Sequence, residues 1–244
     1  MPAPELWLLA DSRLPTGGHA HSGGIEAAVR RGLVRAPDDV AAWLAGRVPT
    51  AGLVTAAAAA AACALVHPRG EDPSALVARG FPSRGTAVTD WAPWDAAISA
   101  RTPVAALREV SRQQGRAMLR TVRQAWPHAE VAGLGTRPHQ ALVLGVAAAA
   151  AGATPEDAAG LAVHHLVGQV CSAAVRLLGL DPLALAGVHA RALAEHAPVV
   201  GTASDAGTTA AAALDPRLLP TATTPLPEVL AVLHARSEGA LFAS

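Results

Sequence analysis

The 244-residue sequence contains no lysine and no tyrosine, and it has only two phenylalanines, two methionines and two cysteines. The absence of lysine excludes Schiff-base chemistry, and the absence of tyrosine excludes a tyrosine nucleophile. The two cysteines, Cys63 and Cys171, lie in apolar segments expected to be helical and form no CxxC pair. We therefore expect buried free thiols in a reducing compartment.

The sequence also lacks a net charge, because nineteen basic residues balance nineteen acidic ones, while 51% of the residues are hydrophobic. Such a composition indicates a globular chain. Neutrality argues against a nucleic-acid partner or an anionic membrane, since both favour a basic surface. No basic segment precedes the first apolar run, and the apolar stretch 52–66 is mostly alanine. We therefore expect no signal peptide, no membrane span and a cytoplasmic location.

Helix signals recur along the chain, whereas no window shows the sustained period-two alternation of a strand. Thr154 and Asp181, for example, are capping residues that each precede a proline at the first helical position. We predict an all-α bundle of about eight to ten helices, formed by residues 1–197. Residues 198–244 are rich in Gly, Ser, Thr and Pro. We predict that they form a flexible C-terminal tail of the same functional unit, ordered against a partner.

Two helices have ends that prolines should define. A helix that starts at Pro37 is expected to end at Pro49. Another is expected to start at Thr102-Pro103 and to run to about Trp126.

Arginines recur every four residues on this second helix, so their side chains share one face and repel each other by roughly a few tenths of a kcal/mol per pair. One interpretation is a solvated face with the charges splayed into water. The other is a docking surface for acidic groups of another subunit. The arginines are Arg108, Arg112, Arg116 and Arg120.

A further helix carries two glycines and a histidine on one stripe, at Gly160, His164 and Gly168. Glycine in a helix costs about 1 kcal/mol relative to alanine, so two on one face indicate tight backbone packing against another helix. We predict that His164 is a hydrogen-bonded packing residue and not a metal ligand.

The stretch 14–26, LPTGGHAHSGGIE, is the least generic part of the sequence. A phosphate-binding loop is disfavoured, because GxxxxGK[ST] requires a lysine. His19 and His21 could share a metal ion, but a working site needs three or four ligands, and no cysteine or carboxylate is close by. A metal-dependent hydrolase that uses His19, His21 and a distant acid remains the alternative function. The sequence has no GxSxG and no HExxH motif.

With the preceding LWLLADSR, this stretch resembles the N-terminal signature of the UreF family of urease accessory proteins. The family pattern is LP-x-GG, then an aromatic-x-aromatic-Ser step, then Gly-Leu/Ile-Glu. His19 and His21 occupy the positions where the family usually has Phe or Tyr.

Three later segments resemble the family in the same order. The first runs from Trp94 through RTPVAALREVSRQQGRAML, and the second joins RPHQALVLGVAAAAAG to VHHLVGQVCSAAVRLLGL. The third is the ending PLPEVLAVLHARSEGALFAS, an apolar helix followed by His234. In it Ala235 and Arg236 replace an acid of the family pattern, and Ala240 replaces an arginine. The family's PLGQ-x-x-GQ turn reads GLDPLALAG here, without either glutamine.

The resemblance implies an all-helical, non-catalytic protein without a cofactor, which dimerises with a second copy. It implies binding to a UreD/UreH accessory protein and recruitment of the GTPase UreG onto apo-urease, so that nickel is inserted in a GTP-dependent step. We expect the arginine row and the tail around Phe242 to contact different partners. The expected interface residues are Gly17, Gly18, His19, Ser22, Gly24, Glu26, Arg108, Arg112, Arg116, Arg120, Arg176, His234, Leu241, Phe242 and Ser244.

Overall fold

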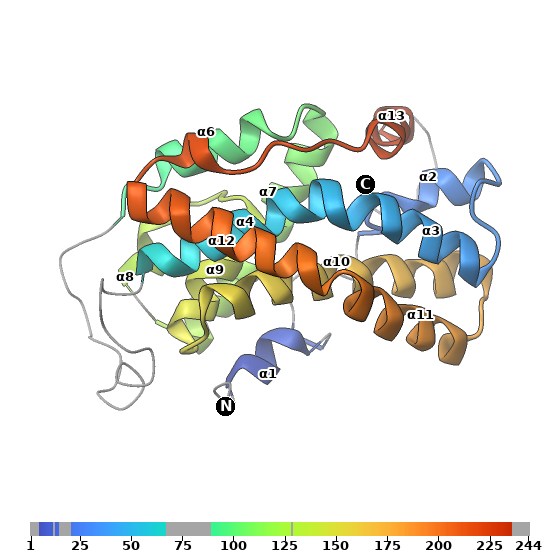
Figure 1. Ribbon diagram of the computed structural model, residues 1–244, viewed down its shortest axis with the longest axis horizontal. Coiled ribbons are helices and arrows are strands. Elements are labelled where there is room, and N and C mark those ends of the chain that lie inside the picture. Colours follow the sequence, from blue (N-terminus) through green and yellow to red (C-terminus); the bar gives the residue numbers. More distant parts are fainter. Residues whose placement is uncertain (1–4, 12, 15–20, 67–88, 128, 236–244) are drawn as a thin grey trace.

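The computed structural model describes residues 5–11, 13–14, 21–66, 89–127 and 129–235. These residues form helices and the turns between them, with no strand in the described ranges, as the sequence predicts (Figure 1). The helices are α1 (Glu5–Ala10), α2 (Ile25–Arg30), α3 (Pro37–Arg47), α4 (Leu53–Val66), α6 (Ala92–Ala100), α7 (Ala105–Ala125), α8 (Ala129–Gly133), α9 (Gln140–Ala150), α10 (Pro155–Leu178), α11 (Pro182–Glu195), α12 (Ala197–Ala213) and α13 (Pro225–His234).

Helix α4 is the centre of the bundle, with α9, α10 and α12 packed around it. Its residues 56–63 are seven alanines and Cys63, and all of them are buried. Alanine adds only a methyl group to the helix surface, so neighbouring helices can approach the α4 backbone closely. The cysteines are free and buried, as predicted.

Two glycines set how close that approach is. A Cβ atom added to Gly145 of α9 would lie 2.2 Å from the carbonyl oxygen of Ala59, and one added to Gly207 of α12 would lie 2.5 Å from that of Ala57. Real Cβ atoms do not approach backbone oxygens so closely. Glycine is therefore required where α9 and α12 cross α4.

The glycines of the predicted stripe on α10 behave differently. A Cβ atom on Gly160 would lie 3.8 Å from Val200, and one on Gly168 would lie 3.5 Å from His189, which are ordinary contact distances. The prediction of tight packing there is wrong, because the stripe faces side chains and not a helix backbone. His164 is a hydrogen-bonded packing residue, as predicted, with its Nε2 atom 3.2 Å from the carbonyl oxygen of Ala10.

The predicted tail is wrong in its first part. Residues 197–213 form α12, which packs against α4 and buries Ala203, Gly207 and Ala210. Glycine, serine and threonine have low helix propensity, but their small size suits a helix that touches α4. Helix α13 follows after a short turn at Pro216–Leu218. Residues 236–244 lie outside the described part of the chain, so the prediction of a flexible tail applies only there.

The helix starts predicted at Thr154 and Asp181 are confirmed, whereas the one predicted at Thr102-Pro103 is wrong. Helix α7 begins at Ala105, and the Thr102 hydroxyl donates to the carbonyl oxygen of Ile98 instead of capping α7. The Thr154 hydroxyl accepts a hydrogen bond from the backbone N–H of Asp157 at 3.1 Å, and the Asp181 carboxylate accepts one from Leu183 at 3.0 Å. Pro49 does not end its helix, contrary to the prediction. Pro49 has no backbone N–H to donate. A π-helical turn at Val48–Gly52 accommodates this change in the hydrogen-bond pattern and leads directly into α4.

Two helical stretches, Pro37–Val66 and Pro155–Leu178, are long and apolar enough to cross a membrane by length and composition. In this structure 61% and 56% of their apolar windows are buried inside the bundle. Packing inside the bundle therefore accounts for the apolar character of both stretches.

The contact of α12 with α4 can be tested by a matched pair of substitutions on α12. Gly207→Ala forces a methyl group against the Ala57 carbonyl and should lower the free energy of unfolding by about 2 kcal/mol. Gly201→Ala meets no atom within 4 Å. It should stabilise the protein by up to about 1 kcal/mol. Urea unfolding followed by circular dichroism measures both, and equal effects would contradict the packing of α12 in the core.

Candidate functional site

Helix α2, from the first part of the sequence, contacts α13, from its last part (Figure 1). The Glu26 side chain is fully buried there and lies 3.6 Å from the Nε2 atom of His234, measured from Oε2. Its Oε1 atom accepts a hydrogen bond from Arg30 Nε at 3.2 Å. A buried carboxylate needs such partners, because an unpaired charge in the interior costs several kcal/mol. The contact joins the first and last segments that resemble the UreF family.

The glycine loop places Glu26 in this buried position. The Ser22 hydroxyl accepts backbone hydrogen bonds from Gly24 at 3.2 Å and from Glu26 at 3.5 Å. Gly23 and Gly24 have φ angles of 62° and 85°, a left-handed conformation that favours glycine. A Cβ atom on Gly23 would also lie 2.7 Å from Val170 of α10. The loop therefore turns tightly against α10 and directs α2 toward α13.

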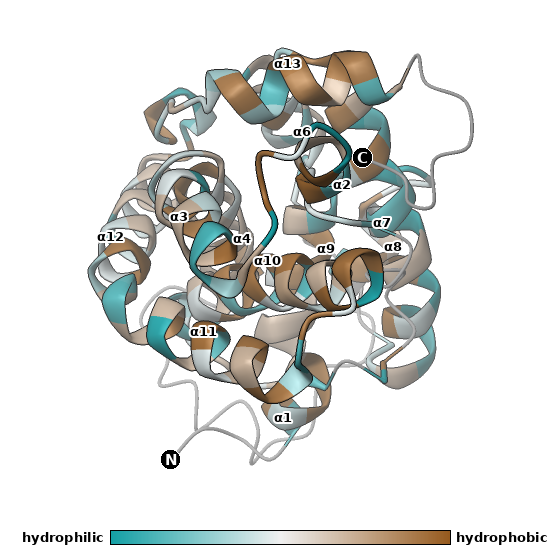
Figure 2. Cartoon of the chain, turned by 90° about the vertical axis from the view of Figure 1, so that its right-hand side faces the viewer, coloured by the Kyte–Doolittle hydropathy of each residue, from teal (hydrophilic) through white to brown (hydrophobic). Residues whose placement is uncertain are grey.

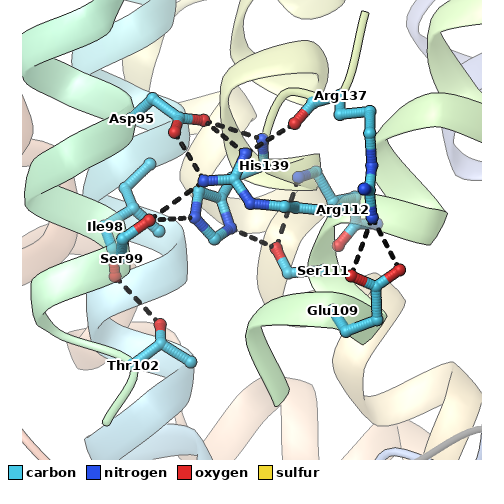
Figure 3. A network of polar contacts seen from close by, with 10 residues as sticks. Asp95, Ile98, Ser99, Thr102, Glu109, Ser111, Arg112, Arg137 and His139 are labelled. Carbon is cyan, nitrogen blue, oxygen red and sulfur yellow. Dashed lines mark hydrogen bonds and ion pairs between the residues drawn. The ribbon is translucent and has the colours of Figure 1, made fainter. Parts of the chain in front are cut away.

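A second polar network joins α6, α7 and the start of α9 (Figure 3). Arg112 donates hydrogen bonds from Nη2 to Asp95 Oδ2 at 2.7 Å and from Nη1 to the carbonyl oxygen of Arg137 at 2.6 Å. Figure 3 shows the guanidinium directed at the Asp95 carboxylate, with the ring of His139 beside it. The Arg112 side chain thus fixes three helical segments relative to one another.

His139 is fully buried in this network between two hydroxyl groups. Its Nε2 atom lies 2.9 Å from Ser99 Oγ, and its Nδ1 atom lies 2.9 Å from Ser111 Oγ. Burial lowers the pKa of His139 to about 4, so the ring is neutral at pH 7, with one nitrogen donating and the other accepting. This residue was not predicted from the sequence. Its position directly before the apolar helix α9 is the one available signal.

The arginine row divides into two halves. Arg108 donates to the carbonyl oxygens of Thr102 and Pro103, at 2.7 and 2.8 Å, and Arg112 belongs to the network above. Arg116 and Arg120 are exposed and make no hydrogen bond or ion pair within the described ranges. We call these two residues the arginine face, because only they remain available to a partner.

Several residues that we expected at an interface are not accessible to one. Ser22 and Glu26 have no exposed surface, and His234 is 5% exposed. Gly24 is also buried. Arg176 is exposed and lines a cavity of about 440 Å³ between α10 and α11. Six further expected residues lie outside the described part of the chain and stay predictions: Gly17, Gly18, His19, Leu241, Phe242 and Ser244.

The metal-ion alternative involves one described histidine, His21, which is 4% exposed. In the part of the chain that the structure describes, no three His, Cys, Asp or Glu side chains are grouped so that they could hold a metal ion. His19 lies outside that part, so a site that includes it stays a prediction.

The sequence model of the UreF family matches residues 34–193. The chain belongs to the UreF family. The urease accessory protein UreF of Mycolicibacterium vanbaalenii is 42% identical over 241 residues, which cover 98% of this chain and 97% of that protein. UreF of Mycobacterium marinum is 39% identical over 98% of this chain and 97% of its own length. UreF of Mycobacterium bovis BCG Pasteur is 44% identical over 72% of this chain and 74% of its own.

The alignments to the first two relatives extend well beyond the segment that the family model matches. They cover nearly the whole chain, whereas Glu26 and His234 both lie outside 34–193. The resemblance read from the four sequence segments is therefore confirmed as UreF family membership.

The neutral state of His139 predicts a pH dependence of stability. In the unfolded chain its pKa is near 6.5, so protons bind preferentially to the unfolded state between about pH 6.5 and pH 4. The contribution of neutral His139 to the free energy of unfolding is complete above pH 6.5. As the pH falls toward 4, this contribution is lost, and the free energy of unfolding decreases by on the order of 2 kcal/mol.

We expect the variant His139→Gln to show a shallower fall in unfolding free energy over the same range, measured by urea titrations at pH 7, 6 and 5. His165, whose pKa burial also lowers to about 4, is present in both proteins and cancels in the comparison. Identical pH profiles would show that His139 is protonated equally in the folded and unfolded states.

Proposed function

We propose that this UreF-family chain is a non-catalytic scaffold that holds a UreD/UreH-type accessory protein and a UreG-type GTPase on apo-urease during GTP-dependent nickel insertion. The observation that carries the proposal is the similarity to urease accessory proteins over 98% of the chain. Two exposed surfaces of different chemistry support it, since a scaffold needs separate sites for its partners.

The first surface lies on α13 and is apolar. Leu226, Val229 and Leu233 recur at helical spacing on the outer side and are 53%, 57% and 39% exposed. Figure 2 shows hydrophobic residues along α13 at the edge of the molecule. We call these three residues the α13 surface. Exposed apolar side chains in such a group mark interaction sites, and long-lived complexes use the more hydrophobic interfaces. We assign this surface to the UreD/UreH-type protein, as the lasting partner.

The second surface is the arginine face on α7. Arg116 and Arg120 are exposed charges, which accelerate the encounter with an acidic partner but bind weakly at high salt. A GTPase that must arrive and leave in each cycle suits such a surface. We assign the arginine face to the UreG-type protein.

We further propose that the chain forms a homodimer in the cytoplasm. Large apolar side chains are also exposed on α1 and α11, where Trp7 is 66% and Leu183 is 81% exposed. A second copy of the chain would cover such residues, and the free thiols of Cys63 and Cys171 suit a reducing compartment.

Binding measurements on two variants test the assignment of surfaces. Arg116→Gln combined with Arg120→Gln should weaken binding of the UreG-type protein at least tenfold and leave the UreD/UreH-type protein bound. Val229→Gln should have the opposite pattern, because it places an amide in an apolar contact. Biolayer interferometry with each purified partner measures both dissociation constants.

Arg191→Gln, at an exposed position on α11, is the matched control and should change neither constant. In a urease-positive host, both surface variants should leave urease poor in nickel. If the two surface variants bind both partners like the parent protein, the division of surfaces is wrong. If the parent protein binds neither partner, the scaffold function itself is wrong.

A further inference from the structure

Arg47, near the end of α3, is a charged side chain that no described residue pairs with. Its Nε atom is buried and makes no hydrogen bond. No nitrogen of the guanidinium forms a hydrogen bond or ion pair with any residue that the structure describes. Burial lowers the pKa of Arg47 to about 10, which still leaves it protonated at neutral pH. The side chain as a whole is half-buried, but a buried donor that lacks a partner is costly, so the retention of Arg47 calls for an explanation.

Arg47 lines a crevice of about 150 Å³ between the glycine loop, α4, α7 and α13. A second arginine in the same lining, Arg101, is fully occupied. It donates from Nε and Nη2 to the carbonyl oxygen of Leu219, at 3.1 and 2.7 Å, and from Nη2 to that of Arg217 at 2.9 Å. Of these two cations, only Arg47 has donors left for a molecule that enters the crevice.

Trp43, one turn earlier on α3, lies near Arg47 but outside the crevice lining. Both side chains pack on the glycine loop: a Cβ atom on Gly24 would lie 3.8 Å from Trp43 Cζ2 and 3.9 Å from Arg47 Cζ. Its indole N–H is buried, and no described residue accepts a hydrogen bond from it. In the crevice itself the free donors are those of the Arg47 guanidinium, which matches a carboxylate with its two acceptor oxygens.

Glu228 of α13 is an acidic residue in the crevice lining, and its charge acts on Arg47 through space. It makes no ion-pair contact with Arg47 in the described structure, and the effect of burial on Arg47 is the larger of the two. Glu228 therefore compensates the arginine only in part. Its negative charge disfavours any anion in the crevice, so a carboxylate would have to be held there by other contacts as well.

We infer that the crevice receives an aspartate or glutamate side chain of the protein that binds the α13 surface. Glu228 lies on α13 between Leu226 and Val229, so the crevice adjoins that apolar surface. A charged anchor surrounded by apolar contacts that exclude water is the arrangement of an interface hot spot. The inference rests on the proposed function, because the partner is the UreD/UreH-type protein assigned to the α13 surface.

The variant Arg47→Met tests this inference, because it keeps the length of the side chain and removes the charge. In the free protein its melting temperature should equal or exceed that of the parent, because a half-buried charge with an unsatisfied Nε donor has been removed. Its affinity for the UreD/UreH-type protein should fall at least tenfold. Arg191→Met, at an exposed position on α11, should alter neither quantity.

The possible outcomes separate the inference from the function on which it rests. If the parent protein binds its partner and Arg47→Met binds equally well, the anchor is wrong and the scaffold stands. If the parent protein forms no complex, the proposed function fails first. A lower melting temperature for Arg47→Met would show that Arg47 is paired inside the folded chain, through Glu228, and would overturn the inference. A second result would also overturn the inference: sodium acetate, compared with sodium chloride, stabilises the free parent protein but not Arg47→Met. A free anion would then be enough to fill the crevice.

Discussion

The structure depends on the approach of α9 and α12 to the backbone of α4. Where Gly145 and Gly207 cross α4, even a methyl group would meet a carbonyl oxygen. The centre of the protein is therefore built from backbone and alanine side chains, and its cohesion comes from many short contacts between small groups. Such a core leaves little room for bulky residues, and the buried tryptophans Trp91, Trp94 and Trp126 lie instead on or beside α6 and α7. A core of this kind tolerates few changes of volume.

The polar networks complement this core, because they fix elements that the alanine contacts do not reach. Glu26 and His234 hold α2 against α13, and Arg112 with Asp95 and His139 holds α6, α7 and α9 together. Buried ion pairs add little net stability, since desolvation offsets most of their attraction, but they specify which groups meet. In this protein they determine how α13 and α7 are presented at the surface. The core supplies the stability, and the networks set the orientation of the faces that partners would contact.

Local signals in the sequence predict local structure well here. The cap at Thr154 and the absence of strand alternation suffice for the helix start and the fold class. Helix α12 was missed because its glycines, serines and threonines have low intrinsic propensity, and its stability comes from α4, more than 130 residues earlier in the chain. The prediction of tight packing along the α10 stripe failed for a related reason. Residue spacing shows which residues share a helix face, but it does not show what that face contacts. The same limit applies to Arg112, whose partner Asp95 lies on another helix.

Family resemblance and exposure also give different information about the site. The signature residues Ser22, Glu26 and His234 are buried, so they influence a partner only through the surface that they position. The exposed residues Leu226 and Val229 lie in the apolar helix of the last family-like segment, but they were not among the residues expected at an interface. Buried residues must satisfy the packing of the fold itself, whereas exposed residues need only suit a partner. The signature therefore identifies the family, and the choice of partner must depend on side chains around the signature.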